Sequence, residues 1–193
     1  HLRLNKKGLS VKDDWSNDEW LFRKFIDSIT PTTEPTLDFL HVTYPHVPYR
    51  YLPSGKRYAQ REDKNNSRGY RREWDKDEWP SIQQYQQHLL QLKFGDVLLG
   101  RLLDKLESTG RLENSILVVT ADHGTSFQPE QFSRRVSEQN FADIMLVPLF
   151  IKLPEQNNAE QSSRNVSTID ILPTITESLG LGLPEHIDGN SLF

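Results

Sequence analysis

The sequence has no cysteine, no long apolar run and no strong excess of charge. Without cysteine no disulfide can form, and thiols give no information about the redox compartment. No uninterrupted apolar stretch approaches the ~18 residues that a membrane-spanning helix needs. The formal net charge of −4 argues against a broad basic face, so nucleic acid is not an expected partner.

The chain starts at His1 without a methionine and without the pattern of a signal peptide. We therefore expect a truncated beginning, with any anchor, signal or upstream domain outside this sequence. Hydrophobic residues make up 35% and charged residues 26% of the chain, which is typical of a globular protein with a packed core. Residues 1–193 are enough for a single domain, or for one lobe of a larger domain.

Three segments have the periodicity of amphipathic helices. The first is Asp18–Ile29, and the last is about Thr168–Leu179. The longest begins near Trp79, and its apolar residues recur at steps of three and four: Ile82, Tyr85, Leu89, Leu92, Leu99, Leu103 and Leu106. This pattern places Asp96 in the apolar face, where a carboxylate needs a partner, and His88 on the exposed face.

Apolar runs at Thr36–Thr43, Ser115–Thr120 and Leu146–Ile151 are typical of buried strands. Residues 50–78 follow neither period and are rich in charge, which predicts a long surface loop; an anion-binding lid is the alternative. Strands alternating with helices indicate an α/β fold. We expect a layered sandwich in which helices flank a mostly parallel central sheet.

Polar residues directly follow the predicted strand Ser115–Thr120. Asp122, His123 and Gly124 come at its carboxyl end, which is where open α/β sheets bind their ligands. Aspartate supplies a hard oxygen and histidine a borderline nitrogen, a pair that suits a divalent ion such as Mn²⁺, Zn²⁺ or Mg²⁺. The alternative is that the pair only caps the next turn, and the residues by themselves leave both interpretations open.

A second candidate site residue is His46, which lies at the end of the first predicted strand. Prolines on both sides restrict the backbone around its imidazole and reduce the entropy lost in holding it in place. Such an imidazole could bind an anionic ester oxygen or protonate a departing alkoxide, or it could be structural. His41 lies inside the strand and is better interpreted as a structural histidine.

Five segments, in the same order, resemble the carboxy-terminal half of the alkaline phosphatase superfamily, especially its sulfatase-like hydrolases and transferases. The strongest match is Glu113-Asn-Ser-Ile-Leu-Val-Val-Thr-Ala-Asp-His-Gly124, which with Gly100–Gly110 is similar to the family's helix, strand and metal-ligand turn. The other segments are His41–Tyr49, Val147–Pro154, Thr168–Ile175 and Asp188–Leu192. The resemblance extends over roughly Thr36–Leu192.

The resemblance implies a function for the intact parent protein: metal-dependent hydrolysis or transfer of a sulfate or phosphate ester. It implies that Asp122 and His123 bind the divalent ion, which would be Mn²⁺, Ca²⁺, Mg²⁺ or Zn²⁺. It also implies that His46 contacts the transferred group or the leaving oxygen. The family is typically extracytoplasmic, in the periplasm or at the cell surface.

Further residues take their expected roles from the same resemblance. Relatives often place substrate contacts in the segment that here contains Arg134, Arg135 and Asn140. Structural roles are expected for Lys152, Asp170 and Asp188.

The sequence departs from the family at the nucleophile. Sulfatases carry a cysteine or serine, converted to formylglycine, in a C/S-x-P-x-R motif, and the transferases use a threonine; both lie upstream of the segments above. No such motif occurs in this sequence. We therefore expect the amino-terminal half of the same protein, or a second chain, to complete the site. The alternatives are a membrane-anchored phosphoethanolamine- or phosphoglycerol-type transferase and a non-catalytic binding module of the same fold.

Overall fold

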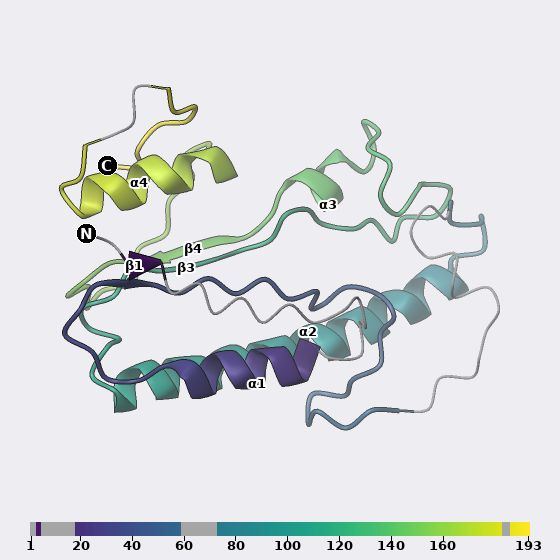
Figure 1. Cartoon of the computed structure of the whole chain (residues 1–193). Helices are drawn as coiled ribbons and strands as arrows, with labels where there is room; N and C mark the ends of the chain where they lie inside the picture. Colours follow the sequence, from purple (N-terminus) through teal and green to yellow (C-terminus); the bar gives the residue numbers. More distant parts are fainter. Residues whose placement is uncertain (1–2, 5–17, 59–72, 183–185) are drawn as a thin grey trace.

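The computed structural model describes residues 3–4, 18–58, 73–182 and 186–193 (Figure 1). Its elements, in chain order, are β1 (Arg3–Leu4), α1 (Asp18–Ser28), β2 (Thr36–Leu37), α2 (Trp79–Ser108), β3 (Leu117–Thr120), α3 (Phe141–Met145), β4 (Leu149–Lys152), the 3₁₀ turn η2 (Thr168–Asp170) and α4 (Ile171–Ser178). In Figure 1, α1 and α2 lie on one side of the β3–β4 pair and α4 lies on the other. Within the described ranges, no helix is both long and apolar enough to cross a membrane.

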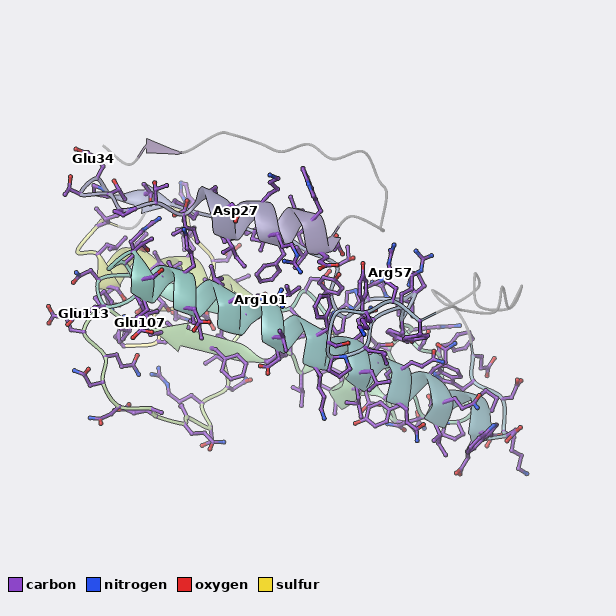
Figure 2. All side chains as sticks on the ribbon, turned by 90° about the horizontal axis from the view of Figure 1, so that it is seen from below. Asp27, Glu34, Arg57, Arg101, Glu107 and Glu113 are labelled. Atoms are coloured by element: carbon purple, nitrogen blue, oxygen red, sulfur yellow. The ribbon has the colours of Figure 1, made fainter. Side chains whose placement is uncertain are left out.

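The core lies between α1 and α2, which run side by side in Figures 1 and 2. Phe94 and Leu98 of α2 have no exposed surface, and Phe22 of α1 packs in the same cluster. Helix α2 begins with a proline in its first turn and ends before Gly110, whose φ of 68° suits glycine. Both helices therefore occupy the ranges that their periodicity predicts.

The predicted apolar face of α2 is buried only towards the end of the helix, where Leu106 belongs to the core and Leu99 packs against it. Four of the residues expected to be buried are exposed: Ile82 by 41%, Tyr85 by 47%, Leu89 by 38% and Leu92 by 46%. Asp96, which was expected inside the apolar face, is exposed as well. Phe94 faces the core, and Asp96 follows it by two positions, which is a rotation of roughly 200° around the helix. Asp96 therefore points away from the core. The prediction of a buried, partnered Asp96 was wrong.

The strands form two short sheets. β3 and β4 pair in antiparallel orientation, with Leu117 opposite Lys152, whereas β1 and β2 pair in parallel. The apolar runs predicted β3 and β4 as members of a mostly parallel sheet, but an apolar run does not encode the direction of its neighbour. Of the predicted strand Thr36–Thr43, only Thr36–Leu37 is regular. The β3–β4 pair is also not buried on both faces within the described residues, since Phe150 is 66% exposed.

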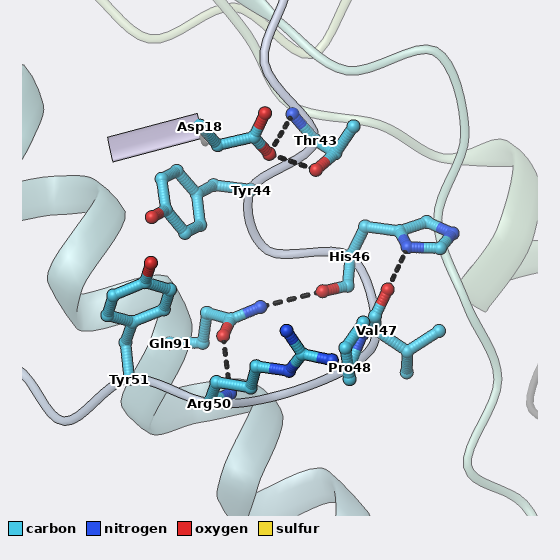
Figure 3. A pocket seen from close by; sticks show the side chains of 9 residues that line it. All are labelled: Asp18, Thr43, Tyr44, His46, Val47, Pro48, Arg50, Tyr51 and Gln91. Atoms are coloured by element: carbon cyan, nitrogen blue, oxygen red, sulfur yellow. Dashed lines mark hydrogen bonds between the residues drawn. The ribbon is translucent and has the colours of Figure 1, made fainter. Parts of the chain in front are cut away.

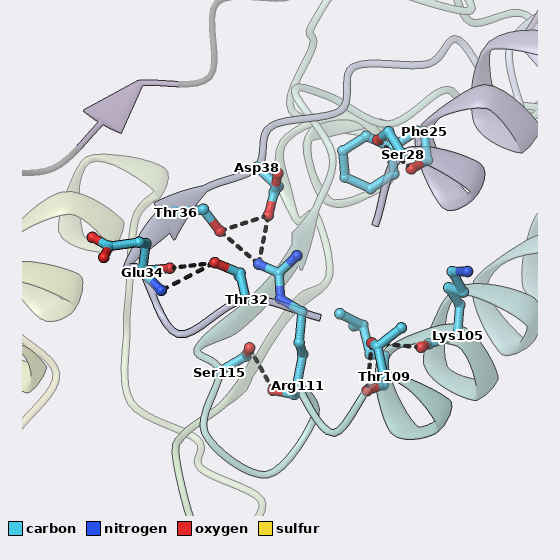
Figure 4. Close-up of polar contacts among 11 residues, drawn as sticks. Phe25, Ser28, Thr32, Glu34, Thr36, Asp38, Lys105, Thr109, Arg111 and Ser115 are labelled. Carbon is cyan, nitrogen blue, oxygen red and sulfur yellow. Dashed lines mark hydrogen bonds and ion pairs between the residues drawn. The ribbon is translucent and has the colours of Figure 1, made fainter. Parts of the chain in front are cut away.

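Arg111 links β2 to the segment between α2 and β3 through hydrogen bonds and an ion pair (Figure 4). Its Nη2 donates to Thr36 Oγ1 at 2.6 Å and forms an ion pair with Asp38 Oδ2 at 2.8 Å. The carbonyl of Arg111 in turn accepts the Ser115 hydroxyl at 2.6 Å. These contacts fix the entry to β3, whose far end carries the candidate site.

Asp170 stabilises the turn η2, which runs directly into α4, so its expected role near the start of the last helix is confirmed. Its carboxylate accepts the backbone N–H of Ser167 at 2.7 Å and that of Asn190 at 2.8 Å. These two hydrogen bonds hold the pKa of Asp170 below its ordinary value. The second bond also ties the closing turn, which contains Asp188, to the helix.

The predicted surface loop at residues 50–78 is described at its two ends, and residues 59–72 lie outside the described residues. Tyr51 at one end is 5% exposed, and Trp74 at the other is 4% exposed. The indole N–H of Trp74 donates to the Ser126 carbonyl at 2.8 Å. Both described ends are therefore packed against the body of the protein.

Candidate active site

The turn after β3 lies against the backbone of α3. The Gly124 N–H donates to the Ile144 carbonyl at 2.7 Å. A Cβ at position 124 would lie 2.0 Å from the Asp143 carbonyl oxygen, so only glycine permits this approach. The close contact fixes the backbone of Asp122 and His123 at the end of β3.

Asp143 also holds the chain beyond the turn. Its Oδ2 accepts hydrogen bonds from Ser126 Oγ and Gln128 Nε2, both at 2.7 Å. Ser126 is fully buried, and its N–H donates to the Ser133 carbonyl at 2.9 Å. Because every polar group named here has a partner, the connection from β3 to α3 is a stable support for the turn.

The imidazole of His123 is oriented by the backbone of the next residue, Gly124. Nδ1 lies 2.7 Å from the Gly124 carbonyl oxygen, and because a carbonyl only accepts, Nδ1 carries the ring proton. Nε2 therefore carries the lone pair of the neutral ring, as in a histidine that binds a metal ion. This Nε2 lies 3.7 Å from Oδ2 of Asp122.

The pair Asp122 and His123 fits two ligands of one divalent ion. Metal–ligand distances of about 2.0 to 2.6 Å place neighbouring ligands roughly 3 to 4 Å apart, and the observed 3.7 Å lies in that range. The Asp122 side chain is 78% exposed, so an ion can reach it. Among the described residues, no group of three or more histidine, cysteine, aspartate or glutamate side chains could hold a metal ion. Two side chains would supply only part of the coordination shell of such an ion.

His46 lies on a loop that is held by α1 and α2 (Figure 3). Its N–H donates to the Thr43 carbonyl at 2.5 Å, and the Thr43 N–H donates to Asp18 of α1 at 2.9 Å. On α2, the Gln91 side chain donates to the His46 carbonyl at 2.6 Å and accepts the Arg50 N–H at 2.8 Å. Figure 3 shows the imidazole of His46 pointing away from Gln91 and Asp18.

Burial, one backbone contact and nearby charges act on the pKa of His46. Burial lowers the pKa of His46, and contact of Nδ1 with the Val47 carbonyl partly offsets this by raising it. The charges of Arg134 and His123 lower the pKa further, and that of Asp122 raises it. Coulombic effects of this kind require proximity. His46 therefore lies within electrostatic range of Asp122, His123 and Arg134.

Arg134 differs from the two other residues of its segment that were expected to contact substrate. Its Nη2 donates to Nε2 of His123, so Arg134 occupies the lone pair that a metal ion would need and must move away from it when an ion binds. Asn140 is fully buried, and its amide donates to the carbonyls of Phe132 and Arg135 at 2.9 and 3.0 Å. Arg135 is exposed and lies 5.4 Å from the centre of the Phe132 ring. Of these three, Arg134 is the residue that reaches the site.

His88 does not lie on the exposed face of α2 where the periodicity put it. Its half-buried ring packs against Tyr49 and Phe127, and its hydrogen bond goes to the Pro45 carbonyl. The helical period gave no sign of this, because these partners come from other segments. Lys152 is structural, as expected, and its Nζ donates to the Glu113 carbonyl at 2.9 Å.

Sequence reasoning missed Gln91. No local pattern could have marked it, because its two partners, Arg50 and His46, lie 41 and 45 positions away in the chain.

The model of the sulfatase family matches residues 7–181, which is far more than half of the chain. The chain belongs to the sulfatase family. Sulfatases generally use a divalent metal ion, which agrees with the oxygen and imidazole donors at the end of β3.

Named sulfatases are among the similar proteins. Arylsulfatase K of Xenopus laevis is 35% identical over 99 residues, which cover 51% of this chain and 18% of that protein. The N-acetylglucosamine-6-O-sulfatase of Bacteroides thetaiotaomicron is 32% identical over 117 residues, which cover 59% of this chain and 20% of that protein. PehA of Trinickia caryophylli, a multifunctional alkaline phosphatase superfamily protein, is 34% identical over 100 residues, covering 51% and 19%. The chain thus spans about a fifth of the length of these relatives.

Solved structures show the same fold. Ps i-CgsB in complex with k-i-k-neocarrahexaose has a TM-score of 0.62 at 18% identity, covering 96% of this chain and 39% of that one. The phosphonate monoester hydrolase SpPMH of Silicibacter pomeroyi has a TM-score of 0.62 at 20% identity, covering 91% and 40%. The likeness confirms the α/β class expected for this sulfatase chain.

Proposed function

We propose that the sulfatase domain to which this chain belongs hydrolyses a sulfate ester at a divalent metal ion, with Asp122 and His123 as two of the ligands. The observation that supports this best is the orientation of His123. The Gly124 carbonyl holds the ring proton on Nδ1, and Nε2 faces Asp122 Oδ2 at 3.7 Å. The other oxygen of Asp122, Oδ1, accepts the His123 N–H at 2.9 Å, so the capping interaction and metal binding use different oxygens.

Arg134 is proposed to bind the anionic oxygens of the ester. Its guanidinium stays charged at all relevant pH values and presents planar donors that match sulfate or phosphate oxygens. Two observations support this proposal: Arg134 contacts the His123 ring, and its charge acts on the pKa of His46. A bound metal ion would supply further positive charge against the oxyanion that develops in the transition state.

His46 is proposed to assist the departing oxygen. Its lowered pKa leaves the ring mainly neutral at pH 7, with the proton of Nδ1 directed at the Val47 carbonyl. When the ring is protonated, the second proton sits on Nε2, and the lowered pKa makes it a stronger acid. The leaving alkoxide takes up this proton as its bond to sulfur breaks.

The remaining ligands and the nucleophile are proposed to come from an amino-terminal half of the same protein. The apolar face of α2, formed by Ile82, Tyr85, Leu89 and Leu92, supports this proposal. These side chains are between 38% and 47% exposed, and a regular apolar stripe on a helix normally packs against another element. We further propose that the parallel β1–β2 pair continues into a mostly parallel central sheet in the intact domain.

A sulfate ester is the favoured substrate class because the relatives named above include an arylsulfatase and an N-acetylglucosamine-6-O-sulfatase. A phosphate or phosphonate ester is the second candidate, because a phosphonate monoester hydrolase shares the fold. We propose an extracytoplasmic location, since a relative from Drosophila melanogaster, 29% identical over 99 residues, is named as a homologue of an extracellular sulfatase.

The test uses the intact parent protein with an aryl sulfate and an aryl phosphodiester. Asp122→Ala and His123→Ala should each lose bound metal and lower kcat/KM by at least about 10²-fold, the scale of losing one transition-state contact. Glu138→Ala and His41→Ala are matched controls, because both side chains are exposed and lie outside the site. Equal metal content and equal activity in all five proteins would refute the assignment, and the ratio of the two activities decides between the ester classes.

A further inference from the structure

Gln91 bonds to both ends of the loop that carries His46. Its side chain comes from α2 and is 2% exposed. Oε1 accepts the Arg50 N–H at 2.8 Å, and Nε2 donates to the His46 carbonyl at 2.6 Å (Figure 3). Because an N–H only donates and a carbonyl only accepts, these two partners dictate the orientation of the amide.

The loop depends on such outside contacts because its own backbone offers few donors. Pro45 and Pro48 have no N–H, so neither position can donate to a turn hydrogen bond. A backbone group left unpaired in a buried site costs free energy comparable to a lost hydrogen bond. His88, three residues before Gln91 on the same face of α2, bonds to the Pro45 carbonyl. Helix α2 therefore determines the position of this loop through two side chains.

We propose that Gln91 is a positioning residue for the reaction. Its amide holds the His46 carbonyl at a defined distance from the Arg50 N–H, and this places the His46 imidazole relative to Asp122 and His123. The inference rests on the proposed function, in which His46 assists the departing oxygen. An amide of this length is needed, because leucine makes neither bond and ionised glutamate cannot donate.

The first experiment measures kcat and KM of the intact protein with the aryl sulfate. Gln91→Leu should lower kcat about 10- to 100-fold, since a displacement of about 1 Å at a reacting group costs up to about 10²-fold. The bound metal should remain, because the ligand turn is held by α3. Gln86→Leu is the matched control, since Gln86 is exposed on the same helix. An unchanged kcat in Gln91→Leu would overturn the proposal.

A double-mutant cycle separates positioning from a general structural role. If Gln91 acts through His46, adding Gln91→Leu to His46→Ala should lower kcat no further. A purely structural role predicts the same loss of kcat in both backgrounds, and this result would overturn the proposal.

Gln91→Glu adds a readout that depends on pH. Ionised glutamate repels the His46 carbonyl, whereas the protonated acid can donate to it. The kcat of this variant, relative to the unsubstituted protein, should therefore rise as the pH is lowered. A ratio that does not change with pH would contradict the role of the amide as donor.

The placement of His46 is also measurable without turnover. The ring resonances of His46, assigned by comparison with His46→Ala, should shift in the NMR spectrum of Gln91→Leu and stay in place in Gln86→Leu. If the intact protein hydrolyses neither ester, the proposed function fails while this shift still reports on positioning. If the shift is absent, the inference about Gln91 fails, whatever the activity.

Discussion

Gly124→Ala is expected to separate the turn that carries Asp122 and His123 from α3. The new Cβ would lie 2.0 Å from the Asp143 carbonyl oxygen, whereas ordinary contacts begin at 3.4 Å. Neither atom belongs to a flexible side chain, so one backbone segment must move by roughly 1 Å or more. The same movement breaks the 2.7 Å hydrogen bond from the Gly124 N–H to Ile144.

The free-energy cost of Gly124→Ala follows from the close contact and the broken hydrogen bond. Forcing a methyl group into a packed site typically costs about 1–3 kcal/mol. Losing one internal hydrogen bond adds about 0.5–1.5 kcal/mol. We expect Gly124→Ala to destabilise the protein by roughly 2–4 kcal/mol, and the displacement of the proposed ligands Asp122 and His123 to lower kcat/KM by about 10²-fold.

The assay combines thermal unfolding, metal content and kcat/KM of the intact protein. Gly100→Ala is the matched control, because an added Cβ there meets nothing within 4 Å. Position 100 lies inside α2, where alanine is favoured over glycine by roughly 1 kcal/mol, so this variant should be as stable as the unsubstituted protein or more stable. If Gly124→Ala matched Gly100→Ala in melting temperature, metal content and activity, the reasoning about the turn would be refuted.

Three further predictions concern stability. The pKa of His46 is lower in the folded protein than its ordinary 6.5, so the unfolded chain binds more protons, and stability should fall as pH drops below about 6.5. Urea titrations at several pH values should show that the stability of His46→Phe depends less on pH than that of the unsubstituted protein. Asp143→Leu leaves the buried Ser126 hydroxyl without its acceptor and should lower the free energy of unfolding by about 1–3 kcal/mol. An unchanged melting temperature in thermal unfolding would contradict the importance of this contact. Phe94→Ala, in a fully buried site, should cost about 3–5 kcal/mol, and equal melting of Phe94→Ala and the half-exposed Leu92→Ala would contradict the observed face of α2.

The helices were predictable because their signals are local. α1 and α2 occupy the ranges that their periodicity predicts, and α4 begins beside Asp170 as expected. The buried face of α2 was not predictable, because the helix has two apolar stripes that look alike in the sequence. Phe94 and Leu98 are buried against α1, while Leu89 and Leu92 remain exposed. Packing, and not periodicity, chose between the two stripes.

Strand pairing was the weakest part of the prediction. The runs that became β3 and β4 were recognised as strands, but their antiparallel pairing was not. A continuous apolar run indicates burial on both faces, and it carries no information about the direction or length of the strand beside it. For the same reason, the run Thr36–Thr43 gave only the short strand β2.

By itself, the sequence determined the family, the positions of the helices and the presence of Asp122 and His123 directly after a strand. These features depend on residues that are close together in the chain, and local patterns are sufficient for them. Only the tertiary structure decided that His46 lies within electrostatic range of this pair and of Arg134, and that Gln91 holds the His46 loop. Such contacts join residues more than 40 positions apart, and their geometry follows from how the helices and loops pack, which no local pattern encodes.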